Sequence, residues 1–240
     1  MASVLFSDVS RTYPGNTQPS LSHVTLHIAD GEFVCIVGPS GSGKTTLLRL
    51  LAGLEPCDSG NIFLGDTDVS EVPPQHRDVA FVFQSFALYP HLSVADNIGF
   101  PLLTAGVPRE QARQQVEETA ALLSLGKLLQ RKPGQLSGGE RQRVAMARAI
   151  VRKPRVFAMD EPMSSIDAHL RRALREEIAA LQASLGITCL YVTHDLAEAN
   201  QLGQRVAVVM NGELQQIGTP DELRDNPANA AVADFLATSA

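Results

Sequence analysis

One octapeptide governs how this chain folds: Gly38-Pro39-Ser40-Gly41-Ser42-Gly43-Lys44-Thr45. It matches the pattern G-x-x-x-x-G-K-[ST] of the phosphate-binding P-loop. Residues 33–37 before it form an apolar run that predicts a buried strand, and residues 46–54 after it predict a helix. Strand, glycine loop and helix, in this order, are the local structure that the motif needs. The alternative, a glycine-rich turn with a chance lysine, does not account for these flanks.

Each residue type in the loop has a chemical reason. Glycines let the backbone curl so that successive N–H groups point inward at phosphate oxygens. The helix that follows adds a partial positive charge at its N-terminus. Lys44 can bridge the β- and γ-phosphates, and the Thr45 hydroxyl can ligand Mg²⁺. The loop therefore predicts a site for nucleotide phosphates and a magnesium ion.

Composition bounds the class of protein. The chain has 240 residues, 44% of them apolar, and a formal net charge of −6. These values predict a globular protein with a sizeable core and argue against a nucleic-acid-binding surface. The three cysteines lack metal-ligand spacing, and their odd number suits a reducing compartment. We find no signal peptide and no apolar run near the ~20 residues that span a bilayer. We therefore expect a soluble, cytoplasmic protein that is able to dock on a membrane protein.

Polar side chains follow three further apolar runs, at the point where each predicted strand ends. They are Gln84, the pair Asp160 and Glu161, and His194. Because open α/β sheets bind ligands beyond the carboxyl ends of their strands, we expect these side chains to lie near the P-loop. Taken singly, a glutamine at a strand end is usually a turn residue, and a lone histidine there is usually structural.

The adjacent carboxylates Asp160 and Glu161 are hard to explain structurally, because charge is costly near a core. A Mg²⁺ ion bound beside them would explain both carboxylates. Asp160 would hold the metal, directly or through water, and Glu161 would polarise the attacking water as a general base. Gln84 would reach the Mg²⁺ or the attacking water.

A second phosphate-binding element is predicted at Leu136-Ser137-Gly138-Gly139-Glu140. Ser137 and Glu140 have capping-box spacing, so a plain helix start is the simplest interpretation. Two consecutive glycines are nevertheless poor first-turn residues, and they expose backbone N–H groups at a positive helix end. The pentapeptide therefore predicts an anion site as well as a helix start.

Residues 85–135 differ in character from the rest. Three prolines are expected to break this segment into short pieces: Pro90, Pro101 and Pro108. Residues 108–123 have the apolar spacing of an amphipathic helix. Residues 86–92 are apolar yet loop-like, so they either pack on their own domain or form a docking surface for another protein.

Together these motifs resemble the ATP-binding subunit of ABC transporters, and the resemblance covers essentially all 240 residues. It implies an α/β fold within one ABC ATPase domain, residues 1–240. A mostly parallel P-loop core would carry an antiparallel β subdomain near the N-terminus and a helical insertion over about residues 85–152. Residues 81–94, 131–133 and 217–220 look like the importer branch for carbohydrates, of maltose, trehalose or glycerol-phosphate type.

The resemblance also implies an activity and partners. The activity would be ATP hydrolysis with Mg²⁺, coupled to solute import, with a sugar as the solute. The partners would be a second ATPase subunit, identical or paralogous, two transmembrane permease subunits and, indirectly, a solute-binding protein, but no nucleic acid. The location would be the cytoplasmic face of a bacterial plasma membrane. The alternatives are import or export of another solute, a soluble ABC ATPase acting on nucleic acid or ribosomes, and a binding module with a vestigial site.

Residue roles follow from the same resemblance. Tyr13 would stack on adenine. Ser137 and Gly139, flanked by Gly138 and Glu140, would contact the γ-phosphate of a nucleotide held by the second subunit. Asp167, otherwise the N-cap of a helix, would lie in the loop that links the two sites. The nucleotide would be held by Gly38, Pro39, Ser40, Gly41, Ser42, Gly43, Lys44, Thr45 and Thr46. Catalysis would use Glu161, His194, Lys44 and Gln84, and the metal would be held by Thr45, Gln84 and Asp160.

One departure concerns the C-terminus. Sugar-importer ATPases usually continue into a C-terminal regulatory barrel, whereas this chain stops soon after Phe235. This suits either a naturally short member of the family or a truncated chain.

Overall fold

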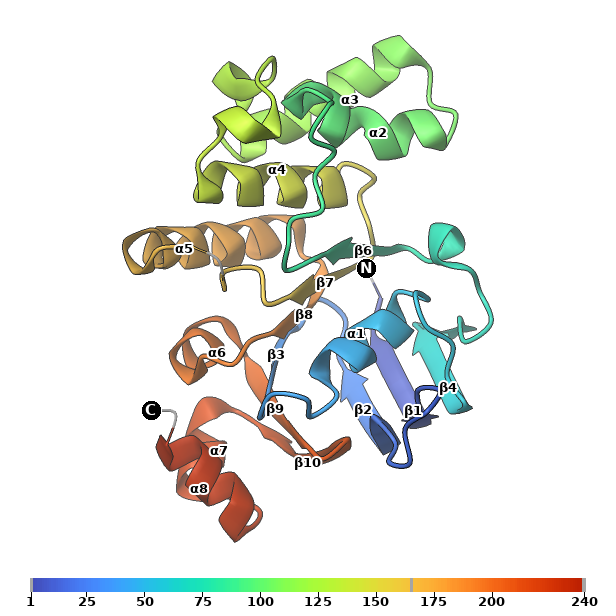
Figure 1. Ribbon diagram of the computed structural model, residues 1–240, viewed down its shortest axis with the longest axis vertical. Coiled ribbons are helices and arrows are strands. Elements are labelled where there is room, and N and C mark those ends of the chain that lie inside the picture. The colour runs from blue at the N-terminus through green and yellow to red at the C-terminus, as the bar shows by residue number, and fades with distance from the viewer. Residues whose placement is uncertain (1, 165, 239–240) are drawn as a thin grey trace.

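The computed structural model describes residues 2–164 and 166–238 and has the predicted α/β architecture, built on two sheets (Figure 1). The larger sheet has six strands in the order β10-β9-β3-β8-β7-β6. Four neighbouring pairs, β9–β3, β3–β8, β8–β7 and β7–β6, are parallel, and β10 pairs antiparallel with β9. The strands are β3 (Phe33–Val37), β6 (Val79–Val82), β7 (Val156–Asp160), β8 (Thr188–Val192), β9 (Arg205–Met210) and β10 (Glu213–Gly218).

The smaller sheet is antiparallel, with the strand order β2-β1-β4-β5. Its strands are β1 (Val4–Arg11), β2 (Leu21–Ile28), β4 (Ser59–Leu64) and β5 (Thr67–Asp68). Alternate residues of β2 are buried and exposed, as expected for a sheet with one solvated face. This is the antiparallel sheet that the sequence predicts near the N-terminus.

The larger sheet separates two hydrophobic cores. Helix α1 (Lys44–Leu51) packs its leucines into one core together with Val34 and Ile36 of β3 and the buried face of the smaller sheet. Helices α5 (Ala168–Leu185) and α6 (Leu196–Leu202) contribute to the other core. Helices α7 (Pro220–Asp225) and α8 (Ala230–Thr238) follow β10 near the C-terminus (Figure 1).

The helices at one end of the molecule form an insertion between β6 and β7 (Figure 1). They are α2 (Val94–Thr104), α3 (Arg109–Leu122) and α4 (Gly138–Ile150). Short 3₁₀ turns occur at Pro74–His76, Gly126–Leu128 and Pro133–Gln135. Helix α4 is the one that begins with the glycine pair of the pentapeptide.

The expectation that Pro101 breaks the chain is wrong, because this residue lies inside α2. A proline in a helix interior costs about 3 kcal/mol. Two effects offset that cost. The Ser93 hydroxyl caps the helix by accepting a hydrogen bond from Asp96 N at 3.0 Å, and Ile98 and Leu102 are buried in the core, each worth roughly 1.5–3 kcal/mol. Tertiary packing therefore overrides the local signal.

The topology brings the carboxyl ends of four parallel strands to the same side of the larger sheet. Because β3, β6, β7 and β8 run parallel, their carboxyl ends meet on this side. The P-loop, Gln84, Asp160-Glu161 and His194 follow these four ends in the sequence. Within the described part of the chain, no helix is both long enough and apolar enough to cross a bilayer.

Candidate functional site

Two glycines of the P-loop, Gly38 and Gly43, leave no room for a side chain. Gly43 is the N-cap of α1 with φ 103°, in the left-handed region that disfavours side chains. A Cβ atom on Gly43 would lie 2.3 Å from the Ser20 carbonyl oxygen, and one on Gly38 would lie 1.9 Å from that of Val209. The first turn of α1 carries no acidic side chain, so its positive end is free to face an anion.

Lys44 and Ser42 line a pocket of about 400 Å³. The pocket is bounded by residues 40–46 together with Ser20, Gln84 and Glu161. Lys44 is only 6% exposed, and its Nζ donates to the carbonyl oxygens of Gly38 at 2.8 Å and Pro39 at 2.7 Å. Burial lowers the pKa of Lys44, although Glu161 and Asp160 oppose that shift. The Ser42 hydroxyl is buried and finds no partner among the described residues. A cation and an unpaired hydroxyl together suit an anionic ligand.

Thr45 and Asp160 bring two oxygen atoms together beside this pocket. Thr45 Oγ1 donates to Asp160 Oδ1 at 2.9 Å, joining the start of α1 to the end of β7. Asp160 is 8% exposed, and burial raises its pKa. An ionised carboxylate in such a place favours a cation nearby. Hydroxyl and carboxylate oxygens are ligands that Mg²⁺ prefers, so the donor set fits that ion.

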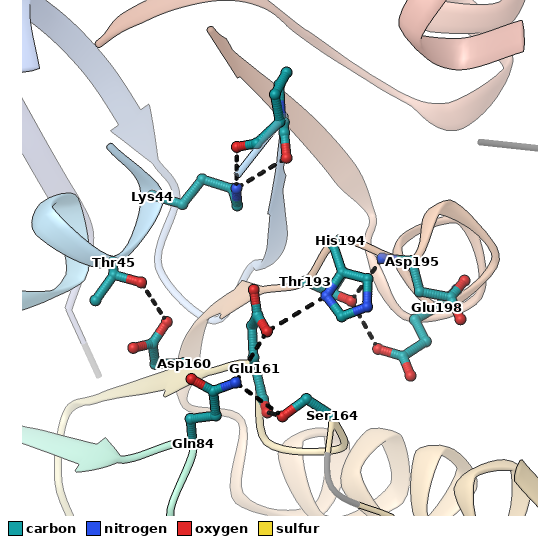
Figure 2. Close-up of polar contacts among 12 residues, drawn as sticks. Lys44, Thr45, Gln84, Asp160, Glu161, Ser164, Thr193, His194, Asp195 and Glu198 are labelled. Atoms are coloured by element: carbon teal, nitrogen blue, oxygen red, sulfur yellow. Dashed lines mark hydrogen bonds and ion pairs between the residues drawn. The ribbon is translucent and has the colours of Figure 1, made fainter. Parts of the chain in front are cut away.

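Glu161 is held in an unusual backbone conformation. Its φ is 43°, a value that non-glycine residues rarely adopt and that recurs at functional sites. Its N–H donates to Val192 O at 3.0 Å. Its Oε2 lies 3.3 Å from Gln84 Nε2 and 3.3 Å from His194 Nδ1, so residues after three different strands meet there (Figure 2). The expectation that the polar strand ends converge is confirmed.

A buried carboxylate supports the loop that carries His194. Glu198 is 4% exposed and accepts a hydrogen bond from Thr193 Oγ1 at 2.9 Å (Figure 2). It also accepts one from Tyr191 Oη at 3.2 Å. Asp195 N donates to the same Thr193 hydroxyl at 3.0 Å. Asp195 caps helix α6 by accepting from the N–H groups of Ala197 and Glu198, whereas the Glu198 side chain bonds to Thr193 and Tyr191. The sequence signal of Glu198, a glutamate four residues after the histidine, does not by itself indicate that it folds back beneath the loop.

Ser137 and Glu140 form both bonds of a capping box at the start of α4. Glu140 N donates to Ser137 Oγ at 3.3 Å, and Ser137 N donates to Glu140 Oε2 at 2.7 Å. The hydrogen bond from the Ser137 N–H to the Glu140 carboxylate is the main reason that the pKa of Glu140 lies below its ordinary value. A Cβ atom placed on Gly138 or Gly139 would have no neighbour within 4 Å among the described residues. Contacts among the described residues therefore do not explain the two glycines.

Three predicted elements do not line the pocket of the P-loop. Tyr13 lies in the loop after β1, where the Arg11 guanidinium sits 5.1 Å from its ring centre. The pentapeptide lies at the N-terminal end of α4. Asp167 takes the N-cap position of α5 but is exposed, and its side chain makes no capping hydrogen bond to the described residues. The structure thus gathers the strand-end residues and leaves these three elements apart from them.

The family model for "ABC transporter" matches residues 21–164 of this chain. The chain belongs to the ABC transporter family. The matched range holds the P-loop, Gln84, the pentapeptide and Asp160-Glu161. The family resemblance inferred from the sequence is thereby confirmed.

Relatives within the ABC transporter family cover this whole chain. It is 56% identical over 240 residues to the diacetylchitobiose uptake system ATP-binding protein MsiK of Streptomyces coelicolor, covering 100% of this chain and 64% of that protein. It is 52% identical over 242 residues to the trehalose/maltose import ATP-binding protein MalK of Thermococcus litoralis, covering 98% of this chain and 64% of that protein. The chain thus spans less than two thirds of the length of these relatives.

A solved ABC transporter cassette shares the fold. The dimeric, post-hydrolysis structure of the ATP-binding cassette MJ0796, bound to ADP and Pi, superposes with a TM-score of 0.79 at 30% sequence identity. The match covers 90% of this chain and 98% of that one. The predicted fold class is therefore confirmed.

Proposed function

We propose that the chain binds and hydrolyses ATP and thereby energises import of a solute through membrane-embedded partners. The single observation that carries this proposal is the meeting of four polar strand ends. The P-loop pocket, the Thr45–Asp160 pair and the Glu161 carboxylate lie at one edge of the parallel sheet. Nucleotide hydrolysis has three requirements: phosphate binding, metal binding and a base that accepts a proton from the attacking water.

The P-loop binds the phosphates. Backbone N–H groups and the positive end of α1 face the pocket, and Lys44 supplies the charge. Lys44 Nζ donates to two backbone carbonyls of the loop, 2.8 and 2.7 Å away. We infer that a phosphate oxygen takes the place of at least one of these carbonyls. Tyr13, on the loop after β1, would stack its ring on the adenine of ATP.

Thr45 and Asp160 are the residues that would hold Mg²⁺, with Gln84 close by. When bound, the ion would neutralise charge on the phosphate oxygens. Within residues 2–164 and 166–238, no cluster of three or more carboxylate, histidine or cysteine groups suits a metal. A small donor set of this kind fits an ion that keeps waters and substrate oxygens among its ligands.

Glu161 is the base in this proposal. It would accept a proton from the water that attacks the terminal phosphorus. Its backbone strain and its contacts with Gln84 and His194 fix where the carboxylate points. Positioning of this kind is the chief contribution that a protein makes to phosphoryl transfer.

A second copy of the chain, or a paralogue, would complete the site. The pentapeptide contains two half-buried glycines that no contact among the described residues requires. The exposed Asp167 side chain makes no capping hydrogen bond within the described structure. The cassette MJ0796 forms a dimer in its structure with ADP and Pi. We infer that Ser137, Gly138 and Gly139 face the γ-phosphate bound by the other subunit, with Glu140 closing the helix cap behind them.

Membrane subunits would dock in a hollow of about 690 Å³ beside the helical insertion. Its walls include Phe81, Ala87, Tyr89, Phe100 and Arg148, and Phe100 is 39% exposed. An apolar hollow with a basic side chain suits a short helix from another protein. The docked protein would place this chain at the cytoplasmic face of the membrane. The names of the relatives favour a sugar as the solute.

The test compares ATP turnover in the wild type, Glu161→Gln and Glu176→Gln. Glu161→Gln keeps the shape of the side chain but cannot accept the proton, so we expect turnover to fall about 100-fold or more while ATP still binds. Glu176 is an exposed glutamate on α5 that pairs with Arg172 one turn away on the same helix, so Glu176→Gln should behave like the wild type. Equal turnover in Glu161→Gln and the wild type would refute the assignment of the base.

A further inference from the structure

The segment that follows Gln84 contains two strained residues in succession. Phe86 has φ 61° and Ala87 has φ 48°, both in the left-handed region that side chains disfavour. Two short turns hold them: Phe86 N donates to Phe83 O at 3.0 Å, and Ala87 N donates to Ser85 O at 2.7 Å. Such conformations persist only where the surroundings enforce them. A residue outside the segment adds to these turns by binding the carbonyl oxygens of Phe86 and Ala87.

That residue is Arg148, in the last turn of α4. Its Nη1 donates to Ala87 O at 2.7 Å and its Nη2 donates to Phe86 O at 2.9 Å. The guanidinium also lies 5.5 Å from the ring centre of Tyr89. The planar fork of arginine suits two neighbouring carbonyls, which the single ammonium group of lysine cannot reproduce. Burial lowers the pKa of Arg148, consistent with a guanidinium that has left water to make these bonds.

Asn97 anchors the far end of the same segment. It is fully buried on α2, and its side chain accepts from Tyr89 N at 2.8 Å and donates to Tyr89 O at 3.1 Å. It also donates to the carbonyl oxygens of Leu92 and Ser93. Two helices of the insertion therefore hold the segment. Arg148 of α4 binds the part that comes directly after Gln84, and Asn97 of α2 binds the part further along the chain.

The segment lies between two sites. On one side, Ala87, Tyr89 and Arg148 line the hollow proposed for the membrane subunits. On the other side, Gln84 contacts Glu161 at 3.3 Å. We propose that Arg148 is a positioning residue that acts through Phe86 and Ala87 to set where Gln84 lies relative to Glu161. This proposal deepens the proposed function and rests on it for its catalytic consequence.

A mechanical consequence follows. Arg148 belongs to the helix that begins with the pentapeptide, so movement of that helix is transmitted to Gln84 through two hydrogen bonds. A protein docked against Tyr89 would act on the same guanidinium. Loss of the fork frees Phe86 and Ala87 to leave the left-handed region, and Gln84 then shifts.

The first test needs no hydrolysis. In ¹⁵N-labelled protein, nuclear magnetic resonance measures amide exchange at Phe86 and Ala87 and the side-chain amide signal of Gln84. For Arg148→Lys we expect faster exchange at both amides, by about tenfold or more, and a displaced Gln84 signal. Arg113→Lys, at an exposed arginine of α3 paired with Glu117, is the matched control and should change neither. Unchanged exchange and an unchanged Gln84 signal in Arg148→Lys would overturn the proposal.

The second test separates positioning from a general loss of stability. We expect Arg148→Lys to lower kcat by about tenfold to 100-fold with little change in KM. In a Gln84→Ala background the same substitution should have no further effect. Ala87→Gly, which adopts a positive φ freely, should restore part of kcat to Arg148→Lys, whereas Ala121→Gly at an exposed position of α3 should not. Additive losses of kcat, or no rescue by glycine, would contradict the proposal.

The two tests fail in different ways. If no variant, including the wild type, hydrolyses ATP, the proposed function fails, while the exchange measurement still decides whether Arg148 sets Gln84. If Arg148→Lys does not fold, Arg148→Met, which keeps the apolar stem of the side chain and removes both donors, decides in its place. We then expect faster exchange at residues 86 and 87 with the fold intact, and unchanged exchange would overturn the proposal.

Discussion

His194 Nδ1 lies 3.3 Å from Glu161 Oε2, which joins the residues that follow two neighbouring parallel strands, β8 and β7. His194 is 63% exposed at its side chain, whereas Glu161 is 24% exposed. The histidine thus contacts the proposed base with one ring nitrogen while most of its ring faces solvent, where substrate would bind. This arrangement makes His194 the most direct probe of how Glu161 is positioned.

His194→Ala should lower kcat about 100-fold, the usual cost of losing one hydrogen-bond donor at a site of developing charge. ATP affinity should change far less, because the P-loop is intact. Steady-state kinetics with a separate nucleotide-binding assay distinguish the two. His169→Ala, at an exposed histidine on α5, is the control. A His194→Ala protein that keeps full kcat would show that the contact with Glu161 is not needed.

Asp160→Asn should have opposite effects on stability and on activity. Burial raises the pKa of Asp160, so its ionised form is costly in the folded chain, and the neutral amide removes that cost. Without nucleotide, we expect the melting temperature to rise by about 2–4 °C, which corresponds to ~1 kcal/mol. Hydrolysis should need far more Mg²⁺. Thermal melts and a magnesium titration of turnover measure the two effects, and unchanged magnesium dependence would rule Asp160 out as a ligand.

The Glu32–Arg205 pair gives a prediction about pH. Arg205 donates to both carboxylate oxygens of Glu32, at 2.5 and 2.7 Å. Burial alone would raise the pKa of Glu32, but the fork from Arg205 and the Ala29 N–H outweigh it and hold the pKa below its ordinary value. The pair therefore adds stability above pH ~4.3, and this stability is lost as the pH falls through the lowered pKa.

Denaturant unfolding across the pH range checks this point. Glu32→Gln should cost about 1 kcal/mol at neutral pH, and the difference from the wild type should close below pH ~4. Glu213→Gln, at an exposed glutamate of β10, should show neither effect. A gap between Glu32→Gln and the wild type that persists at low pH would mean that the contribution is not one of charge.

Gly139→Ala separates the fold of this chain from its assembly. A Cβ atom at this position would meet nothing within 4 Å among the described residues, and alanine is the better helix former by about 1 kcal/mol. The melting temperature of the isolated chain should therefore stay the same or rise. If the pentapeptide faces a nucleotide on a second subunit, turnover should fall by about tenfold or more. Unimpaired turnover in a stable Gly139→Ala protein would argue against that role.

Local sequence motifs predicted the residues of the site better than they predicted the residues that hold the site in place. The P-loop and the polar strand ends were found because each is set by a few adjacent residues, and parallel strands bring such ends together. The role of Glu198 was not predicted, because its place beneath Thr193 depends on how α6 folds back onto β8. Arg148 lies 61 residues from Ala87, so sequence spacing gave no sign of their hydrogen bond.

The helical insertion was predicted only in part, for a physical reason. The apolar spacing of residues 108–123 predicted a helix, and the structure has α3 at Arg109–Leu122. Helix α2 was missed because Pro101 argues against a helix locally, whereas the burial of Ile98 and Leu102 supports one. Helix α7 was also missed, although the capping box of Thr219 and Glu222 was a usable signal.

The most direct test of the account is the molar mass of Glu161→Gln in solution, measured by light scattering with Mg-ATP, with Mg-ADP and without nucleotide. The account predicts a dimer with Mg-ATP alone, because slow hydrolysis keeps the γ-phosphate between each P-loop and the pentapeptide of the other subunit. Adding Gly139→Ala should abolish that dimer. A Glu161→Gln protein that is saturated with Mg-ATP yet stays monomeric would contradict the shared site.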